Sequence, residues 1–183
     1  MDSPHSIFFR PHVDHFDLPC ERLPKEFDGL VVLHLSDLHV THWTRRLDLW
    51  RDELARLKPD VVVITGDLGH RSWLWKVSFA SLVKLLEPLA APLGTFFILG
   101  NHDSVKLGPA IAETRDAAGR PRRLLKNETI FIHKNGNGFA VGDEPGVGGA
   151  ARLALIGVHQ HRRIDTDIPS ALRNVTPQDF KLM

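Results

Sequence analysis

Short apolar runs and longer amphipathic segments alternate along the first two thirds of the chain. Apolar runs typical of buried strands occupy residues 30–35, 61–65 and 96–99. Between them, apolar residues three and four positions apart predict helices over 44–58 and 73–86, each ended by a proline. A weaker helix is predicted over 105–118. This alternation predicts an α/β fold, a sheet with helices outside it.

The pattern changes in the last third of the chain. Apolar runs over 129–133 and 139–141, separated by the residues KNGNG, predict a β-hairpin that starts a second sheet. Further strands are predicted over 152–158 and 180–182. The glycine-rich segment 142–150 lacks the Lys-Ser/Thr ending of a nucleotide-binding loop, so we interpret it as a flexible turn.

Polar residues capable of metal binding and proton transfer follow each of the first three predicted strands. They are separated by about one strand–helix–strand unit each, and such units place successive strands side by side. The side chains should therefore converge on one edge of the sheet as a mixed oxygen and nitrogen set suited to divalent transition metals. In chain order they are Asp37 and His39, then Asp67, then Asn101, His102 and Asp103.

The third of these segments offers three kinds of chemistry. Asn101 can give a metal a neutral oxygen, His102 can transfer a proton near neutral pH, and Asp103 can fix the tautomer of the imidazole. Taken alone, the segment is equally typical of a strand-to-loop turn. Asp67 has an alternative interpretation as a helix N-cap, but the residues after it do not start a strong helix. A carboxylate that bridges two cations is the favoured interpretation of Asp67.

Composition and charge limit the candidate functions. The chain has 183 residues with 43% hydrophobic content, enough for one domain, which we place at 23–183 after an N-terminal tail over 1–22. Lys plus Arg number 23 against 22 for Asp plus Glu, so no broad positive field favours nucleic acid as a partner. The single cysteine, Cys20, excludes an internal disulfide and fits a reducing compartment. No signal peptide is indicated at the N-terminus.

Three motifs together carry a resemblance to a known family. Asp37-Leu38-His39, Gly66-Asp67 and Gly100-Asn101-His102-Asp103, in that order at strand ends, resemble those of the calcineurin-like metallophosphoesterases. The flanking residues 23–29, 58–60 and 91–94 are most similar to a bacterial subgroup that includes membrane-associated phosphodiesterases and lipid A precursor pyrophosphatases. The implied fold is a β-sandwich flanked by helices, in α/β/β/α layers.

The resemblance also implies an activity and a set of site residues. The reaction is hydrolysis of a phosphoester, phosphodiester or pyrophosphate bond by a water that two divalent ions activate, with manganese, iron or zinc as the metal. The metal ligands are Asp37, His39, Asp67 and Asn101, while His102, oriented by Asp103, protonates the leaving oxygen. The expected substrate is a small-molecule or lipid-linked phosphoester. The expected location is cytoplasmic, with peripheral membrane association left open.

The chain departs from the family pattern at two places. His70 stands where the family has a second acidic residue. His159 and His161 either supply the late Gly-His-x-His motif or stand in an earlier Gly-Val-x-Asp turn. The second alignment implies that the late histidine motifs are absent and that the C-terminal part of the domain is missing. A truncated, catalytically impaired remnant is therefore the alternative function, and a nuclease is the third hypothesis.

Other polar and aromatic residues have less specific interpretations. His34 is expected to form a hydrogen bond within the sheet. His42 and Trp43 either line a substrate pocket or, as we favour, pack near a helix start. A basic cluster either contacts phosphate groups or, as we favour, lies at a solvated helix end. It consists of Arg120, Arg122, Arg123 and Lys126.

Overall fold

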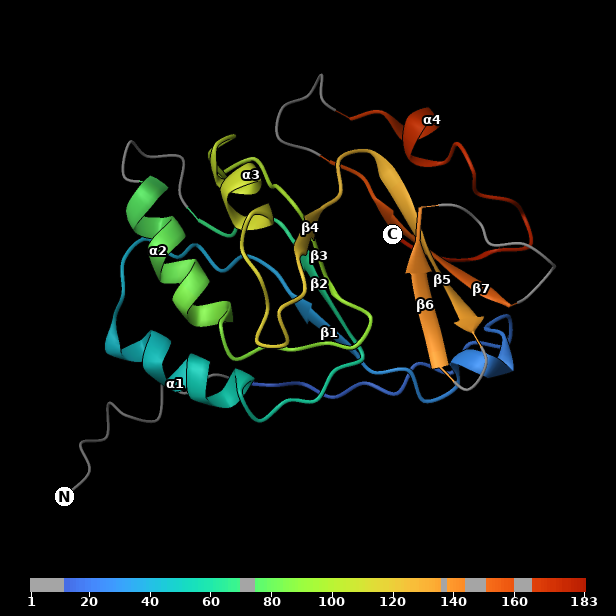
Figure 1. The fold of residues 1–183 in the computed structure, drawn as a ribbon, viewed down its shortest axis with the longest axis horizontal. Helices are drawn as coiled ribbons and strands as arrows, with labels where there is room; N and C mark the ends of the chain where they lie inside the picture. The colour runs from blue at the N-terminus through green and yellow to red at the C-terminus, as the bar shows by residue number, and fades with distance from the viewer. Residues whose placement is uncertain (1–11, 70–74, 136–137, 144–150, 160–165) are drawn as a thin grey trace.

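The computed structural model of the chain contains two four-stranded sheets and four α-helices in the residues it describes, which are 12–69, 75–135, 138–143, 151–159 and 166–183 (Figure 1). The first sheet has the strand order β1-β2-β3-β4, and every neighbouring pair is parallel. Parallel strands need crossover connections, which helices α1, α2 and α3 supply. The elements are β1 (Val32–Leu35), α1 (Arg45–Leu54), β2 (Val61–Thr65), α2 (Trp75–Leu86), β3 (Thr95–Ile98), α3 (Leu107–Ala112) and β4 (Arg122–Leu124).

The second sheet follows directly after β4 and has the order β6-β5-β7-β8. Strand β5 pairs antiparallel with both β6 and β7, whereas β8 runs parallel to β7. The predicted hairpin and the predicted strand at 180–182 are therefore confirmed. The remaining elements are the 3-10 helix η2 (Lys25–Phe27), β5 (Glu128–Asn135), β6 (Gly138–Gly142), β7 (Arg152–Gly157), α4 (Ile168–Ala171) and β8 (Phe180–Leu182).

Alternating side chains divide the core into three layers of packing. In β5, Ile130 and Ile132 point toward the first sheet, whereas Phe131 points to the opposite side with Ala171 of α4. Side chains also alternate between the two faces in β2, where Val62 and Ile64 pack beneath the helices. Figure 1 shows α1, α2 and α3 on one side of the first sheet and the second sheet on its other side. The predicted α/β/β/α architecture is confirmed.

The third helix is shorter than predicted. The pattern predicts a helix over 105–118, but α3 spans only Leu107–Ala112. The Thr114 hydroxyl donates to the carbonyl of Ile111 at 2.6 Å, and the Asp116 carboxylate accepts the amides of Ala118 and Arg120. Short polar side chains that bond nearby backbone groups favour turns over helix, which explains the early end.

The prediction that the basic cluster lies at a solvated helix end is wrong, because α3 ends at Ala112 and Arg122 is buried; of the four residues, only Lys126 is exposed. Arg122 starts β4 with 2% of its surface exposed and donates to the carbonyl of Leu86 at 2.9 Å and to the Thr114 hydroxyl at 2.8 Å. Burial lowers the pKa of Arg122, and the charge of Asp116 opposes that shift only in part. Arg123 forms ion pairs with Glu128 and Asp143. These two arginines stabilise the fold.

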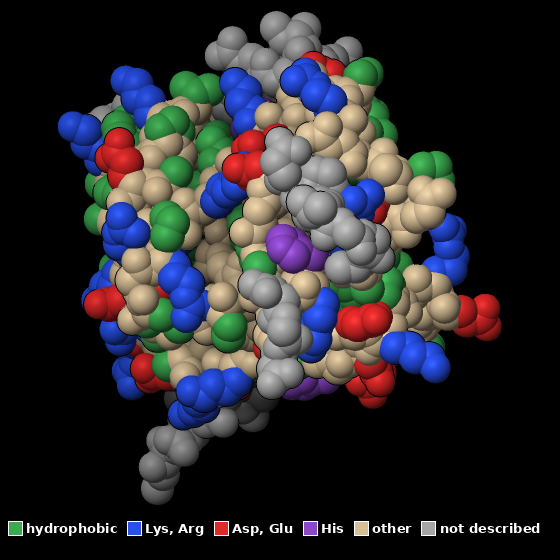
Figure 2. Space-filling view, turned by 45° about the vertical axis from the view of Figure 1, so that its right-hand side comes forward, with side chains coloured by type: hydrophobic (Ala, Val, Ile, Leu, Met, Phe, Trp, Pro, Cys, Tyr) green, Lys and Arg blue, Asp and Glu red, His purple; other side chains and the backbone are tan. Residues whose placement is uncertain are grey.

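The surface agrees with the near balance of charge along the chain. On the face shown in Figure 2, Lys and Arg side chains are interspersed with Asp and Glu side chains. Among the described helices, none combines the length and the apolar character that a bilayer crossing requires.

Candidate metal centre

The loops that follow β1 and β2 run side by side at the carboxyl edge of the first sheet. The parallel pairing of the strands continues past their ends, because the Asp37 amide donates to the carbonyl of Gly66 at 3.2 Å and the His39 amide donates to that of Asp67 at 2.9 Å. These bonds explain why residues about one strand–helix–strand unit apart in sequence meet in space. The carboxyl edge is also where open α/β sheets bind ligands.

The residues of this edge have an unusual backbone conformation. Four non-glycine residues in the described ranges have positive φ, namely Asp37 at 53°, His39 at 44°, Asp67 at 50° and Asn127 at 54°. This left-handed region costs a non-glycine residue about 1–3 kcal/mol, and such strain clusters at functional sites. Three of these, Asp37, His39 and Asp67, are among the four residues that the motifs predicted as ligands.

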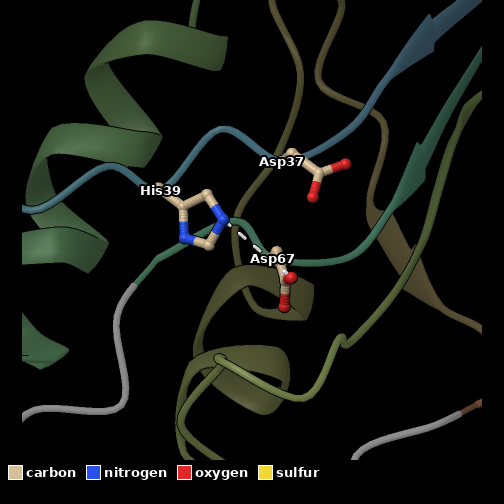
Figure 3. A group of neighbouring side chains, drawn as sticks. All are labelled: Asp37, His39 and Asp67. Carbon is tan, nitrogen blue, oxygen red and sulfur yellow. Dashed lines mark ion pairs between the residues drawn. The ribbon is translucent and has the colours of Figure 1, made fainter.

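The side chains of Asp37, His39 and Asp67 form one group (Figure 3). One ligand atom from each lies within 4.8 Å of the others, and the Nε2 of His39 is 4.0 Å from Oδ2 of Asp67. Ligands at about 2.1 Å from a shared ion are at most about 4.2 Å apart, so small side-chain movements would complete the site. Two carboxylates with an imidazole fit a divalent transition metal.

The loop after β3 contacts this group through Gly100 and His102. The His102 amide donates to Oδ1 of Asp67 at 2.9 Å, and the His102 ring lies edge-on to the His39 ring with 5.4 Å between centroids. A Cβ atom on Gly100 would lie 2.2 Å from Oδ1 of Asp67, so only glycine fits there. Asn101 lies between these residues, and its role as a ligand stays a prediction.

Asp103 is completely buried, and its carboxylate accepts hydrogen bonds from its own loop and from the loop after β2. Its Oδ1 accepts the Gly69 amide at 2.8 Å and its Oδ2 accepts the Gly100 amide at 2.9 Å. Sequence reasoning missed these hydrogen bonds, because residue types alone do not indicate which backbone amides a side chain meets. The predicted role of Asp103 in orienting His102 stays a prediction.

The later histidines do not extend the group within the described residues. There, Asp37, His39 and Asp67 form the one group of three or more His, Cys, Asp or Glu residues close enough to share an ion. His159 is buried, and its amide donates to Oδ1 of Asn127 at 3.0 Å. The predictions for His70 and His161 lie outside the described residues.

Two structural interpretations near the site are confirmed. Nε2 of His34 lies 2.8 Å from the Thr65 hydroxyl, a hydrogen bond between β1 and β2. The Trp43 indole donates to Asp48 at 3.0 Å, and the ammonium of Lys84 lies 3.8 Å from its ring centroid. Trp43 therefore packs against helices α1 and α2.

The chain therefore combines an α/β/β/α fold with a carboxylate–imidazole group, of a composition that suits a divalent metal, at the ends of parallel strands. The family model described as calcineurin-like phosphoesterase matches residues 30–178 of the chain. The chain therefore belongs to the calcineurin-like phosphoesterase family.

Three relatives show the range of this similarity. An uncharacterized metallophosphoesterase of Aquifex aeolicus is 28% identical over 174 residues, which cover 93% of the chain and 60% of the relative. The UDP-2,3-diacylglucosamine pyrophosphatase LpxG of Chlamydia trachomatis is 41% identical over 87 residues, 44% of the chain and 26% of LpxG. A cAMP/cGMP dual specificity phosphodiesterase of Mycobacterium tuberculosis is 37% identical over 87 residues, 40% of the chain and 27% of the relative.

The chain thus spans between about a quarter and three fifths of the length of these relatives. No solved structure matches it significantly.

Proposed function

We propose that the chain is a metal-dependent phosphoesterase that hydrolyses a phosphoester, phosphodiester or pyrophosphate bond with two divalent ions. The observation that carries this proposal is the group formed by Asp37, His39 and Asp67, whose ligand atoms lie within 4.8 Å of one another on a strained backbone. Manganese, iron and zinc suit these ligands best, because magnesium favours oxygen ligands alone.

The proposed ligands divide between two ions. Asp37 and His39 would hold the first ion, Asn101 would hold the second, and Asp67 would serve as a ligand to both. When bound, the ions supply Lewis acidity at the phosphoryl oxygens and a water whose pKa is lowered toward neutrality. The contacts of Asp67 support its position between the loops. Its Oδ1 accepts a hydrogen bond from the His102 amide at 2.9 Å, and its Oδ2 lies 4.0 Å from Nε2 of His39.

His102 is proposed to supply the proton that the leaving oxygen needs. Its ring lies edge-on to the His39 ring at 5.4 Å, so it borders the ligand group without occupying it. An imidazole is the side chain whose ordinary pKa best suits proton transfer near neutral pH. Orientation of this ring by Asp103 belongs to the same proposal.

The proposed substrate is a phosphodiester or a pyrophosphate-linked molecule, small or lipid-linked. The names of two relatives support this class, since one is a pyrophosphatase of a diacylated sugar nucleotide and the other a cyclic nucleotide phosphodiesterase. Asp37 is exposed and the His39 side chain is 44% exposed, so a bulky substrate can approach the group. A cytoplasmic location belongs to the same proposal, with peripheral membrane association left open.

Metal titration and hydrolysis of an aryl phosphodiester test this function. The wild-type chain should bind Mn²⁺, Zn²⁺ or Fe²⁺ and hydrolyse the diester, and EDTA should abolish turnover. Asp67→Asn should lose both properties, whereas Asp52→Asn, a matched change at an exposed position of α1, should keep them. Equal turnover by wild type and Asp67→Asn would refute the assignment. Metal binding without turnover would favour the alternative, a catalytically impaired remnant.

A further inference from the structure

Asp103 connects two loops that sequence separates. One carboxylate oxygen accepts the amide of Gly69, in the loop after β2, at 2.8 Å, and the other accepts the amide of Gly100, in the loop after β3, at 2.9 Å. The residue is 0% exposed. Burying a carboxylate costs free energy unless hydrogen bonds compensate for the lost water. The hydrogen bonds from the two backbone amides therefore stabilise Asp103 in its buried position.

A second hydrogen bond joins the same two loops, with the donor in the loop after β3 and the acceptor in the loop after β2. Asp67 belongs to the loop after β2 and accepts the amide of His102, from the loop after β3, at 2.9 Å. Each loop therefore supplies one aspartate that accepts a backbone amide of the other. The loops also touch directly, because a Cβ on Gly66 would lie 2.6 Å from the backbone nitrogen of Gly100.

We propose that Asp103 is a positioning residue that clamps these loops and so holds the Asp67 carboxylate where it can bind metal. The inference rests on the proposed function, since it concerns the metal affinity of the same site. It assigns Asp103 an action through backbone amides, which is distinct from orienting the His102 imidazole. Partners that orient metal ligands typically change metal affinity about 10–100-fold when they are removed.

Asp103→Asn is the sharpest variant because it keeps the shape of the side chain. Its single oxygen can accept one amide, and its NH₂ group then faces the other amide donor inside a buried site. Asp116→Asn is the matched control. Asp116 is also buried, but its Oδ1 alone accepts the amides of Ala118 and Arg120, so asparagine can keep both bonds.

Two measurements separate the clamp from the proposed function. Amide hydrogen exchange by NMR on the metal-free protein reports the clamp itself, and calorimetric titration with Mn²⁺ reports its consequence. In wild type, the amides of Gly69 and Gly100 should exchange at least about 10-fold more slowly than exposed loop amides. Asp103→Asn should raise exchange at one or both glycines and weaken Mn²⁺ binding by about 10–100-fold, while Asp116→Asn changes neither.

Each other outcome has a definite meaning. Unprotected Gly69 and Gly100 amides in the wild-type chain overturn the clamp, and this result needs no variant that folds. Unchanged exchange, or unchanged Mn²⁺ affinity, in Asp103→Asn overturns it as well. A wild-type chain that binds none of the tested ions overturns the proposed function, whereas the exchange rates still decide the clamp.

Discussion

Gly100→Ala should remove metal binding by displacing Asp67. The added Cβ would lie 2.2 Å from Oδ1 of Asp67 and 2.6 Å from its backbone nitrogen, where ordinary contacts begin at 3.4 Å. The carboxylate or the loop must therefore move by about 1.2 Å, whereas metal–ligand distances tolerate only about 0.2 Å. Gly100 is not among the glycines with positive φ, so the substitution acts through this overlap alone.

The displacement should affect both stability and affinity. Overpacking a tight contact costs about 1–3 kcal/mol, which lowers the Tm by about 2–4 °C for each kcal/mol in a domain of this size. Because the displaced group is a proposed ligand to both ions, Mn²⁺ affinity should fall by more than about 100-fold. Thermal unfolding and calorimetric titration of the same preparation measure the two effects.

Gly157→Ala is the control for this experiment. Its Cβ would lie 2.2 Å from the Cβ of Leu125, an equal overlap within the core and outside the ligand group. It should lose a similar amount of stability and keep the Mn²⁺ affinity of wild type. The reasoning is refuted if Gly100→Ala binds Mn²⁺ normally, or if Gly157→Ala loses as much affinity.

Three further substitutions test the fold. Burial raises the pKa of Asp179, but bonds from Arg152 and Thr176 lower it more, so its folded-state pKa is below the ordinary value. The stability from Asp179 is thus present above about pH 4 and is lost as the pH falls through the folded pKa. Urea unfolding of Asp179→Asn should therefore show a loss of about 1–3 kcal/mol at pH 7, and this loss should shrink as the pH is lowered below about 4; a loss that does not depend on pH would contradict this. Arg122→Met should cost about 3 kcal/mol in urea unfolding, because buried acceptors lose their donor, and a loss below 0.5 kcal/mol would contradict this. Phe131→Ala, at 0% exposure, should cost about 3–5 kcal/mol by the same assay, with an unchanged midpoint counting against its place in the core.

The parts of the fold that depend on apolar periodicity were predictable from the sequence. The strands at 61–65 and 180–182 have the predicted bounds, and α1 and the hairpin differ only at their ends. The proximity of Asp37, His39 and Asp67 was predictable for the same reason, since parallel strands bring their carboxyl ends to one edge. These inferences need only repeating patterns and topology.

The parts that depend on single side-chain bonds were not predictable. Asp116 ends the helical region by accepting two loop amides, and Arg122 is buried because three acceptors surround its guanidinium. A cluster of arginines in sequence indicates only charge, so it favoured solvent exposure. The clamp formed by Asp103 needs the relative positions of two loops, which the motif around it does not contain.

The strained backbone and the bonds between loops have a common consequence for the site. Left-handed φ angles at Asp37, His39 and Asp67 persist only if neighbouring contacts over-determine them. Three hydrogen bonds supply those contacts. The backbone amides of Asp37 and His39 donate to carbonyl groups of the loop after β2, and the backbone amide of His102 donates to the Asp67 carboxylate. These contacts hold the loops that carry the three ligand atoms, which lie within 4.8 Å of one another, so an arriving ion has less of the loops to order. That arrangement places the free-energy cost of the site on folding and leaves ion binding correspondingly stronger.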